Sequence, residues 1–157
     1  MNHHLANMNI ARFRYQPDDP RLADFVNNLE KINALGEQAE GFVWRLKDDS
    51  GNAIAVRAYE DPRIILNLSV WRSIEALQIF AYRSEHVQFF RRRQEWFEEH
   101  RLPALALWWV KAGHIPTPVE ARQRLETLIA KGPTSEAFTF KERFPPPIQY
   151  YVTCNVT

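Results

Sequence analysis

The stretch that decides the fold is residues 64–77, IILNLSVWRSIEAL, in which a strand pattern passes directly into a helix pattern. The β-branched and aromatic residues of IILNLSVW, 64–71, are typical of a strand. Ser73 belongs to the residue types that cap helix starts, and the apolar residues Ala76 and Leu77 follow it. We therefore predict a strand over 64–71 and a long helix that begins after Ser73 and runs towards Glu99.

Towards the N-terminus, the sequence predicts two more strands and one helix. Residues 5–15, LANMNIARFRY, have an alternating character and predict a first strand. Residues 42–46, FVWRL, predict a short strand, and 48–52, DDSGN, predict a turn or the start of a longer loop before 54–57. From Arg21 the apolar residues follow the spacing of an amphipathic helix: Leu22, Phe25, Val26, Leu29 and Ile32.

Towards the C-terminus, residues 102–110, LPALALWWV, predict a strand whose nearly continuous apolar character indicates cover on both faces. Residues 119–131 predict a helix that Gly132 and Pro133 end. Thr117 and Glu120 have the positions of a capping box around its start. The last segment, 134–157, is rich in aromatic residues and proline, and we expect it to wrap over the body.

The order β-α-β-β-α-β predicts an α+β protein with the ferredoxin-like arrangement, a four-stranded antiparallel sheet with two helices on one face. We expect one domain over 1–157, with the ferredoxin-like core at 5–115 and a C-terminal helix and wrapping tail at 116–157.

Large apolar residues occur in both alternating sets of the predicted strands, so the face without helices is also apolar. An uncovered face of that size exceeds what a soluble monomer tolerates. Two explanations stay open: two copies packed sheet to sheet as a homodimer, which we prefer, or cover by the segment 134–157 of the same chain. The residues concerned are Trp44, Leu66, Leu68, Leu105, Leu107, Trp108 and Trp109.

The composition excludes several classes of protein. With ten Phe, five Trp and five Tyr in 157 residues, the chain is folded rather than disordered. A formal net charge of +1 gives no reason to expect a nucleic acid or an anionic membrane as partner. The single cysteine, Cys154, excludes an internal disulfide framework. The sequence has no apolar run long enough for a membrane span and no secretion signal, so we expect a cytoplasmic protein.

Candidate chemistry lies on the long predicted helix, where Tyr82, His86, Phe89 and Arg93 share one face. A phenol, an imidazole and a guanidinium along one groove could orient and polarise a small ligand. The ordinary pKa of histidine suits general acid-base work. The alternative is that this face packs under the aromatic tail, with His86 hydrogen-bonded to a carbonyl.

Tryptophans and one loop histidine complete the candidates. Trp71 and Trp108 could line a pocket for a flat apolar ligand, or they could fill the core, as could Trp96 and Trp109. His114 lies in a loop between strand and helix, where binding sites often gather. We find no glycine-rich phosphate loop and no carboxylate cluster with metal-binding spacing, and we expect no metal site.

The block 69–77, followed by Phe80, Ser84 and His86, resembles the antibiotic-biosynthesis-monooxygenase-like group of dimeric α/β-barrel proteins. More narrowly, the chain is similar to an uncharacterised bacterial family of that superfamily. The matching segments lie between residues 5 and 144, at 5–9, 80–86, 91–97, 107–117, 132–134 and 137–140.

The resemblance implies a homodimer whose two sheets form a barrel, with a mostly apolar pocket between sheet and helices in each subunit. Relatives include cofactor-free monooxygenases of polyphenolic or quinol substrates, and haem-degrading enzymes that use an asparagine, a tryptophan and a histidine. Asn9 (or Asn7) and His86 match the asparagine and the histidine. The helical tryptophan is missing, because Phe80 and Tyr82 occupy that stretch, and this weakens the haem-degradation hypothesis.

Our first hypothesis is a cofactor-independent, monooxygenase-like enzyme for a small aromatic or hydrophobic substrate. His86 would handle a proton, assisted by Tyr82 and Asn9, and the expected substrate contacts are Trp71, Phe89, Arg93, Trp108 and His114. The alternative is a non-catalytic homodimer that binds a small molecule or has a structural role. A third hypothesis is haem binding through His86 or His114.

Overall fold

The structure is a computed structural model and describes residues 2–48 and 57–148. The predicted turn at 48–52 and the segment 54–57 lie almost entirely outside the described residues. The elements are β1 (His3–Arg12), η1 (Pro20–Leu22), α1 (Ala23–Gln38), β2 (Phe42–Arg45), β3 (Ile64–Trp71), α2 (Ile74–Arg83), α3 (His86–Arg91), α4 (Arg93–Trp96), β4 (Leu105–Lys111) and α5 (Pro118–Lys131).

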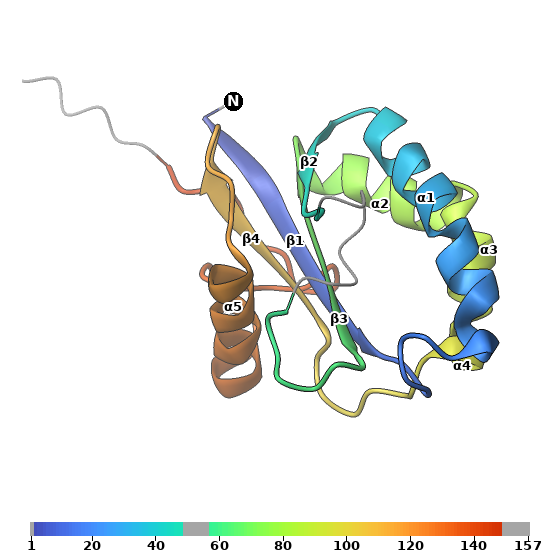
Figure 1. Ribbon diagram of the computed structural model, residues 1–157. Coiled ribbons are helices and arrows are strands. Elements are labelled where there is room, and N and C mark those ends of the chain that lie inside the picture. The colour runs from blue at the N-terminus through green and yellow to red at the C-terminus, as the bar shows by residue number, and fades with distance from the viewer. Residues whose placement is uncertain (1, 49–56, 149–157) are drawn as a thin grey trace, which may run out of the picture.

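The four strands form one antiparallel sheet in the order β2-β3-β1-β4. This order, with α1 after β1 and α2 after β3, is the ferredoxin-like arrangement, and it confirms the predicted α+β fold class. Figure 1 shows α1 to α4 on one side of the sheet and α5 on the other. Among the described residues, no helix is both long and apolar enough to span a bilayer.

The long helix predicted after Ser73 begins where expected but does not run unbroken to Glu99. The Ser73 hydroxyl caps α2 by accepting a hydrogen bond from the Ala76 amide at 3.1 Å. Ser84 then ends α2, because its hydroxyl donates to the carbonyl of Phe80 and accepts from the His86 amide. A serine side chain that competes for backbone groups in this way interrupts a helix. Tyr82, His86 and Arg93 therefore lie on three separate helices instead of one face.

The second face of the sheet is covered within one chain. Of the apolar residues that made a sheet-to-sheet dimer attractive, Leu66, Leu68 and Trp108 are buried against α5, which supplies Ala121, Leu125 and Leu128, and Trp44 packs against the same cluster. The others, Leu105, Leu107 and Trp109, belong to a second cluster, with Trp71 and Phe138. This finding removes the physical reason for expecting a second copy on this face. Within the described part of the tail, residues 134–148, only Ala137 belongs to this cluster. The sheet residues concerned include Ala6, Met8, Leu66, Leu68, Val70, Ala106, Trp108 and Val110.

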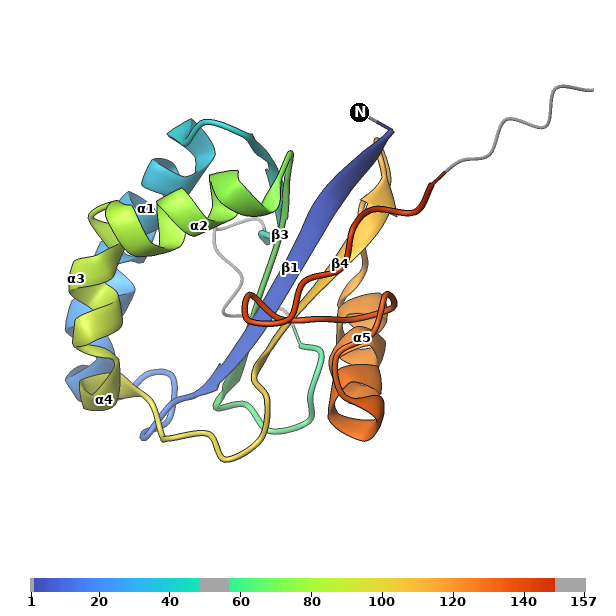
Figure 2. The same cartoon turned by 180° about the vertical axis from the view of Figure 1, so that it is seen from behind.

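The segment after α5 packs mainly against β4 and the first face. Phe138 exchanges two backbone hydrogen bonds with Leu107, of 2.8 and 2.9 Å, and its ring is fully buried beside Leu5 and Trp71. The Trp109 indole donates to the carbonyl of Phe144 at 2.8 Å. Figure 2 shows this segment, in orange to red, crossing the sheet at β4. The segment thereby closes one side of the space between the sheet and α2.

The turn before β2 depends on a glycine. Gly41 has a φ of +82°, and a Cβ there would lie 2.5 Å from the Cβ of Ala76 on α2. Gly132, at the end of α5, has a φ of +74°, but no neighbouring atom lies within 4 Å of the position that its Cβ would occupy. We expect Gly132→Ala to cost only the backbone penalty of roughly 1–3 kcal/mol, because its φ of +74° and ψ of −176° lie in a region that is essentially restricted to glycine, and Gly41→Ala to cost more because β2 and α2 must separate. Urea unfolding of both variants measures the difference, and equal losses would contradict this packing.

Candidate functional site

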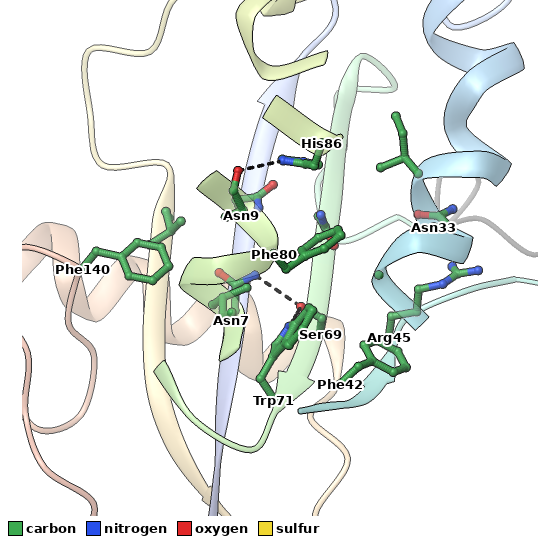
Figure 3. Close-up of a pocket in the computed structure, with 16 residues that line it drawn as sticks. Asn7, Asn9, Asn33, Phe42, Arg45, Ser69, Trp71, Phe80, His86 and Phe140 are labelled. Carbon is green, nitrogen blue, oxygen red and sulfur yellow. Dashed lines mark hydrogen bonds between the residues drawn. The ribbon is translucent and has the colours of Figure 1, made fainter. Parts of the chain in front are cut away.

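A cavity of about 100 Å³, open to solvent, lies between the first face of the sheet and the helices α1 and α2. Its floor comes from β1, β3 and β4, and its walls from the helices, β2 and the C-terminal segment. Figure 3 shows the side chains that point into it. The lining residues are Asn7, Asn9, Ile32, Asn33, Gly36, Phe42, Arg45, Asn67, Ser69, Trp71, Leu77, Phe80, Ala81, His86, Leu105 and Phe140.

The floor of the cavity is polar because two neighbouring strands carry polar residues in the same register. Asn7 and Asn9 lie two residues apart on β1, and Asn67 and Ser69 lie two residues apart on β3, so each pair faces the same side. The antiparallel register places Asn7 opposite Ser69 and Asn9 opposite Asn67. Four polar side chains thus form one patch on this face of the sheet.

Ser69 is the centre of a buried hydrogen-bond group in this floor. Its hydroxyl oxygen accepts from the Trp71 indole at 2.9 Å and from the Asn7 amide nitrogen at 3.3 Å. Asn7 is 4% exposed and Ser69 6% exposed. The amide oxygen of Asn7 is buried and has no hydrogen-bond partner. A buried polar atom without a partner is costly, so this oxygen marks a place where a ligand could bind.

Aromatic rings form the walls. The Trp71 ring stacks on Phe80 with centroids 5.2 Å apart, and Phe42 meets Trp71 edge to face at 5.5 Å. Phe80 in turn lies 5.2 Å from the His86 ring. These contacts orient Trp71 and His86 by packing, and they give the cavity flat apolar surfaces suited to a planar ligand.

The hydrogen bond of His86 determines its tautomer. Nδ1 lies 3.3 Å from the carbonyl oxygen of Ala81. A carbonyl can only accept, so Nδ1 carries the proton and Nε2 keeps a free lone pair. Burial lowers the pKa of His86 below its usual 6.5, and the Ala81 carbonyl opposes this shift only partly. At neutral pH His86 is therefore an uncharged proton acceptor beside the cavity.

The tautomer and pKa of His86 are open to direct measurement. We expect the imidazole of His86 to titrate below pH 6.5, because its protonated form is poorly solvated. Two-dimensional NMR of the ring nitrogens should give a protonated Nδ1 and an unprotonated Nε2 at pH 7.5. A titration above pH 6.5, or the opposite tautomer, would show that His86 is not held as described.

The remaining charge at the cavity is balanced. The Arg45 guanidinium borders it and pairs with the Glu37 carboxylate at 2.7 Å. Of the described lining residues, only Arg45 and His86 can carry a charge. With Arg45 paired and His86 neutral, the cavity presents amides, a hydroxyl and aromatic rings, a surface that suits an uncharged ligand.

A family model described as "Domain of unknown function (DUF3291)" matches residues 4–154. The chain belongs to the DUF3291 family. This membership agrees with the resemblance to an uncharacterised family. No curated protein matches the sequence.

Solved structures are similar to this DUF3291 chain at low identity. PA3566 from Pseudomonas aeruginosa shows 14% identity and a TM-score of 0.47, covering 73% of this chain and 98% of its own. SnoaB from Streptomyces nogalater, a cofactor-independent oxygenase, shows 12% identity and a TM-score of 0.45, covering 73% and 97%. The NE2512 protein of unknown function from Nitrosomonas europaea shows 12% identity and a TM-score of 0.45, covering 73% and 96%.

Three of the candidate residues, His86, Asn9 and Trp71, line the cavity of this DUF3291 protein. Tyr82 does not, because it is 52% exposed and packs edge to face on Phe140 at 5.9 Å. The carbonyl bond that our alternative predicted for His86 is present, and the cavity still lies beside the ring.

Phe89 and Arg93 also lie outside the cavity. The Phe89 ring stacks on Trp96 with centroids 6.3 Å apart. The Arg93 guanidinium lies over the Phe90 ring and donates to the Phe90 carbonyl at 2.9 Å. Both side chains belong to the packing between the short helices α3 and α4.

Trp108 and His114 both contact Glu120, on the side of the sheet opposite the cavity. The Trp108 indole donates to one carboxylate oxygen of Glu120 at 3.1 Å, and Nε2 of His114 lies 2.7 Å from the other. Thr117 caps α5 as predicted, accepting from the Glu120 amide. The Glu120 side chain, however, does not complete a capping box, since it ties α5 to β4 and the following loop.

The sequence analysis did not single out four of the residues that line the cavity: Ser69, Asn67, Asn33 and Arg45. A sequence pattern that could have identified Asn67 and Ser69 was present. Asn67 and Ser69 are polar positions with period two inside the apolar strand IILNLSVW, and they match Asn7 and Asn9 in spacing. Within the described residues, no cluster of three or more His, Cys, Asp or Glu side chains could hold a metal ion.

Proposed function

We propose that this protein is a small-molecule enzyme of the cofactor-independent oxygenase type, acting on an uncharged single-ring aromatic compound that carries a hydroxyl group. The observation that carries the proposal is the contact of His86 Nδ1 with the Ala81 carbonyl, which leaves Nε2 as the proton acceptor, beside an aromatic cavity with a neutral polar floor. The resemblance to the antibiotic-biosynthesis-monooxygenase-like group supplies the reaction type.

The size of the cavity supports a single ring. Its volume is about 100 Å³, whereas pockets for larger ligands measure roughly 300–1,000 Å³. An engineered cavity of about 150 Å³ holds benzene. This cavity is somewhat smaller but open to solvent, so one ring can lie between Phe80 and the sheet with a substituent in the opening. A polycyclic substrate would require the walls to move.

His86 would act as the general base. A hydroxyl hydrogen-bonded to Nε2 gives its proton to the imidazole, and the resulting phenolate is electron-rich at the ring carbons ortho and para to the oxygen. Phe80 holds the imidazole ring, and the Ala81 carbonyl stabilises the imidazolium that forms. The side-chain amides of the cavity floor, Asn7, Asn9 and Asn67, can donate hydrogen bonds to the ring substituents or accept hydrogen bonds from them.

Dioxygen is the oxidant in the proposed reaction. The phenolate carbon forms a bond to one oxygen atom, and the imidazolium returns its proton to the other. The ring carbon then loses its hydrogen as a proton while the O–O bond breaks, leaving a ring carbonyl and water. For phenol itself, each molecule of substrate and each molecule of dioxygen give one molecule of benzoquinone and one of water. All four electrons that reduce dioxygen come from the substrate.

Haem does not fit this cavity, although relatives of the wider superfamily degrade it. A cavity of about 100 Å³ accepts one ring and not a macrocycle of four pyrrole rings. His114, the other histidine considered, is bonded to Glu120 on the opposite side of the sheet. We derive no step through haem.

Oxygen uptake tests the proposal. Purified protein without added cofactor or metal is mixed in air with a panel of mono- and dihydric phenols, and dioxygen and quinone are followed together. We expect one quinone formed for each dioxygen consumed with at least one monohydric phenol. Binding of a phenol without any uptake would contradict the proposal and leave the alternative, a non-catalytic binding protein.

The homodimer predicted from the resemblance is a separate proposal. Residues of one chain supply the floor and the walls of the cavity. Because α5 covers the second face, the partner would have to pack against another surface. Light scattering should give about twice the chain mass of 18.5 kDa if the prediction holds, and a mass of one chain would contradict it.

A further inference from the structure

We propose that Asn7 and Ser69 form a binding pair for a hydroxyl group, located at the end of the cavity away from His86, and that this pair determines which ring substituent is accepted. The inference rests on the proposed function for the ring-sized ligand. It adds a second point of recognition, which requires an uncharged group able both to donate and to accept a hydrogen bond.

The first step of the argument is the hydrogen-bond capacity of Ser69. A hydroxyl oxygen has two lone pairs and one hydrogen. The Trp71 indole and the Asn7 amide nitrogen occupy both lone pairs. The Ser69 hydrogen is then left as a donor, and among the described residues no acceptor for it is found. Ser69 lines the cavity, so a ligand atom there can accept this hydrogen.

The second step is the acceptor beside that donor. The amide oxygen of Asn7 is buried and unpartnered in a side chain that is only 4% exposed. The bond from the Asn7 nitrogen to Ser69 holds the two groups together. The pair therefore presents one free donor and one free acceptor next to each other. A hydroxyl satisfies both, a methyl ether cannot donate, and a carboxylate brings a negative charge against the amide oxygen.

The third step is the position of the pair relative to His86. Figure 3 shows His86 at one end of the cavity and Asn7 with Ser69 at the other, with Phe80 between them. Asn9, the floor residue nearer His86 in this view, lies two residues from Asn7 on β1, about 7 Å along the strand. This spacing suits a six-membered ring with hydroxyl groups on opposite carbons, one facing His86 and the other facing Asn7 and Ser69.

The test is a set of dissociation constants measured under nitrogen, so that oxidation plays no part. The probes are hydroquinone, 4-methoxyphenol and 4-hydroxybenzoate, which differ only at the carbon opposite the hydroxyl. We expect the wild-type protein to bind hydroquinone about 10-fold to 100-fold more tightly than the other two, the range expected when a buried polar group loses its partner.

Two substitutions identify the residues responsible. Asn7→Leu, which keeps the number and branching of the side-chain heavy atoms, and Ser69→Ala should each bring the three dissociation constants close together. Asn7→Leu keeps the bond from Trp71 to Ser69, so it tests the pair even if Ser69→Ala disturbs the fold. It should also raise the melting temperature of the unliganded protein, because the unpartnered oxygen is gone. Tyr82→Phe, outside the cavity, should leave the preference unchanged.

Several results would overturn the inference. Equal binding of the three probes by the wild type, no binding of any of them, or an unchanged preference in Asn7→Leu would each do so. Tightest binding of 4-hydroxybenzoate would show that the Asn7 amide nitrogen faces the ligand. The proposed function fails separately, through absent oxygen uptake in air, so the two failures are distinguishable.

Discussion

Replacing His86 by glutamine should lower kcat for oxygen uptake by about 10²–10⁴-fold, the usual contribution of a general base. Glutamine retains polar atoms near the position of the imidazole, but it cannot accept a proton at neutral pH. The dissociation constant of the substrate should change much less, because the aromatic walls and the polar floor remain. Steady-state kinetics with parallel binding measurements separate the two effects.

The pH dependence provides a second measure of the same group. Only the neutral imidazole accepts a proton, and burial lowers the pKa of His86 below 6.5. Activity should therefore rise from acid pH with a midpoint below pH 6.5. Tyr82→Phe serves as the control and should keep the wild-type rate. Equal rates in His86→Gln and the wild type would show that His86 is not the base.

The same pKa shift links His86 to folding stability. The folded protein binds this proton less readily than the unfolded chain does. The stability that His86 contributes is therefore present above the unfolded pKa of about 6.5 and is lost as the pH falls through the lower folded pKa. Denaturant unfolding at several pH values should show a shallower acid loss in His86→Gln.

The second large effect concerns stability. Phe138→Ala should destabilise the protein by about 3–5 kcal/mol, the usual cost of removing a buried phenylalanine ring. Phe138 is fully buried against Leu5, Trp71 and Leu107, and its backbone pairs with β4. Its loss also loosens the segment that carries Phe140, a lining residue of the cavity. Urea unfolding measures the effect.

Phe90→Ala makes the same chemical change at a site that is 47% exposed. It should cost far less, since most of that ring already contacts water and its main partner is Arg93. Similar losses for Phe138→Ala and Phe90→Ala would mean that the segment after α5 is not part of the core. A large loss only at Phe138 would support the packing described above.

Local patterns predicted the elements well because their determinants are local. The alternation in IILNLSVW and the cap at Ser73 require no knowledge of distant residues, and the strand order then follows from chain connectivity. The break at Ser84 was missed because serine is tolerated inside helices. Its bond to the Phe80 carbonyl is also available inside a helix, and the bond from the His86 amide accompanies the extended backbone of Ser84.

The site was predicted only in part because a sequence does not show which face of a strand is inward. Trp71 and Trp108 look alike in the sequence, yet the register places Trp71 in the wall of the cavity and Trp108 against α5. The position of α5 over the second face likewise depends on how the chain crosses the sheet. An amphipathic helix is recognisable from its spacing, but the spacing does not identify the surface that it covers.

A crystal structure grown with hydroquinone under nitrogen tests the central claim most directly, since it locates the ligand and its hydrogen bonds together. The account predicts a ring beside Phe80, with one hydroxyl within about 3 Å of Nε2 of His86. The other hydroxyl should contact the Asn7 amide oxygen and the Ser69 hydroxyl. A cavity without the ring, or a ring bound elsewhere on the protein, would contradict the assignment of this cavity as the substrate site.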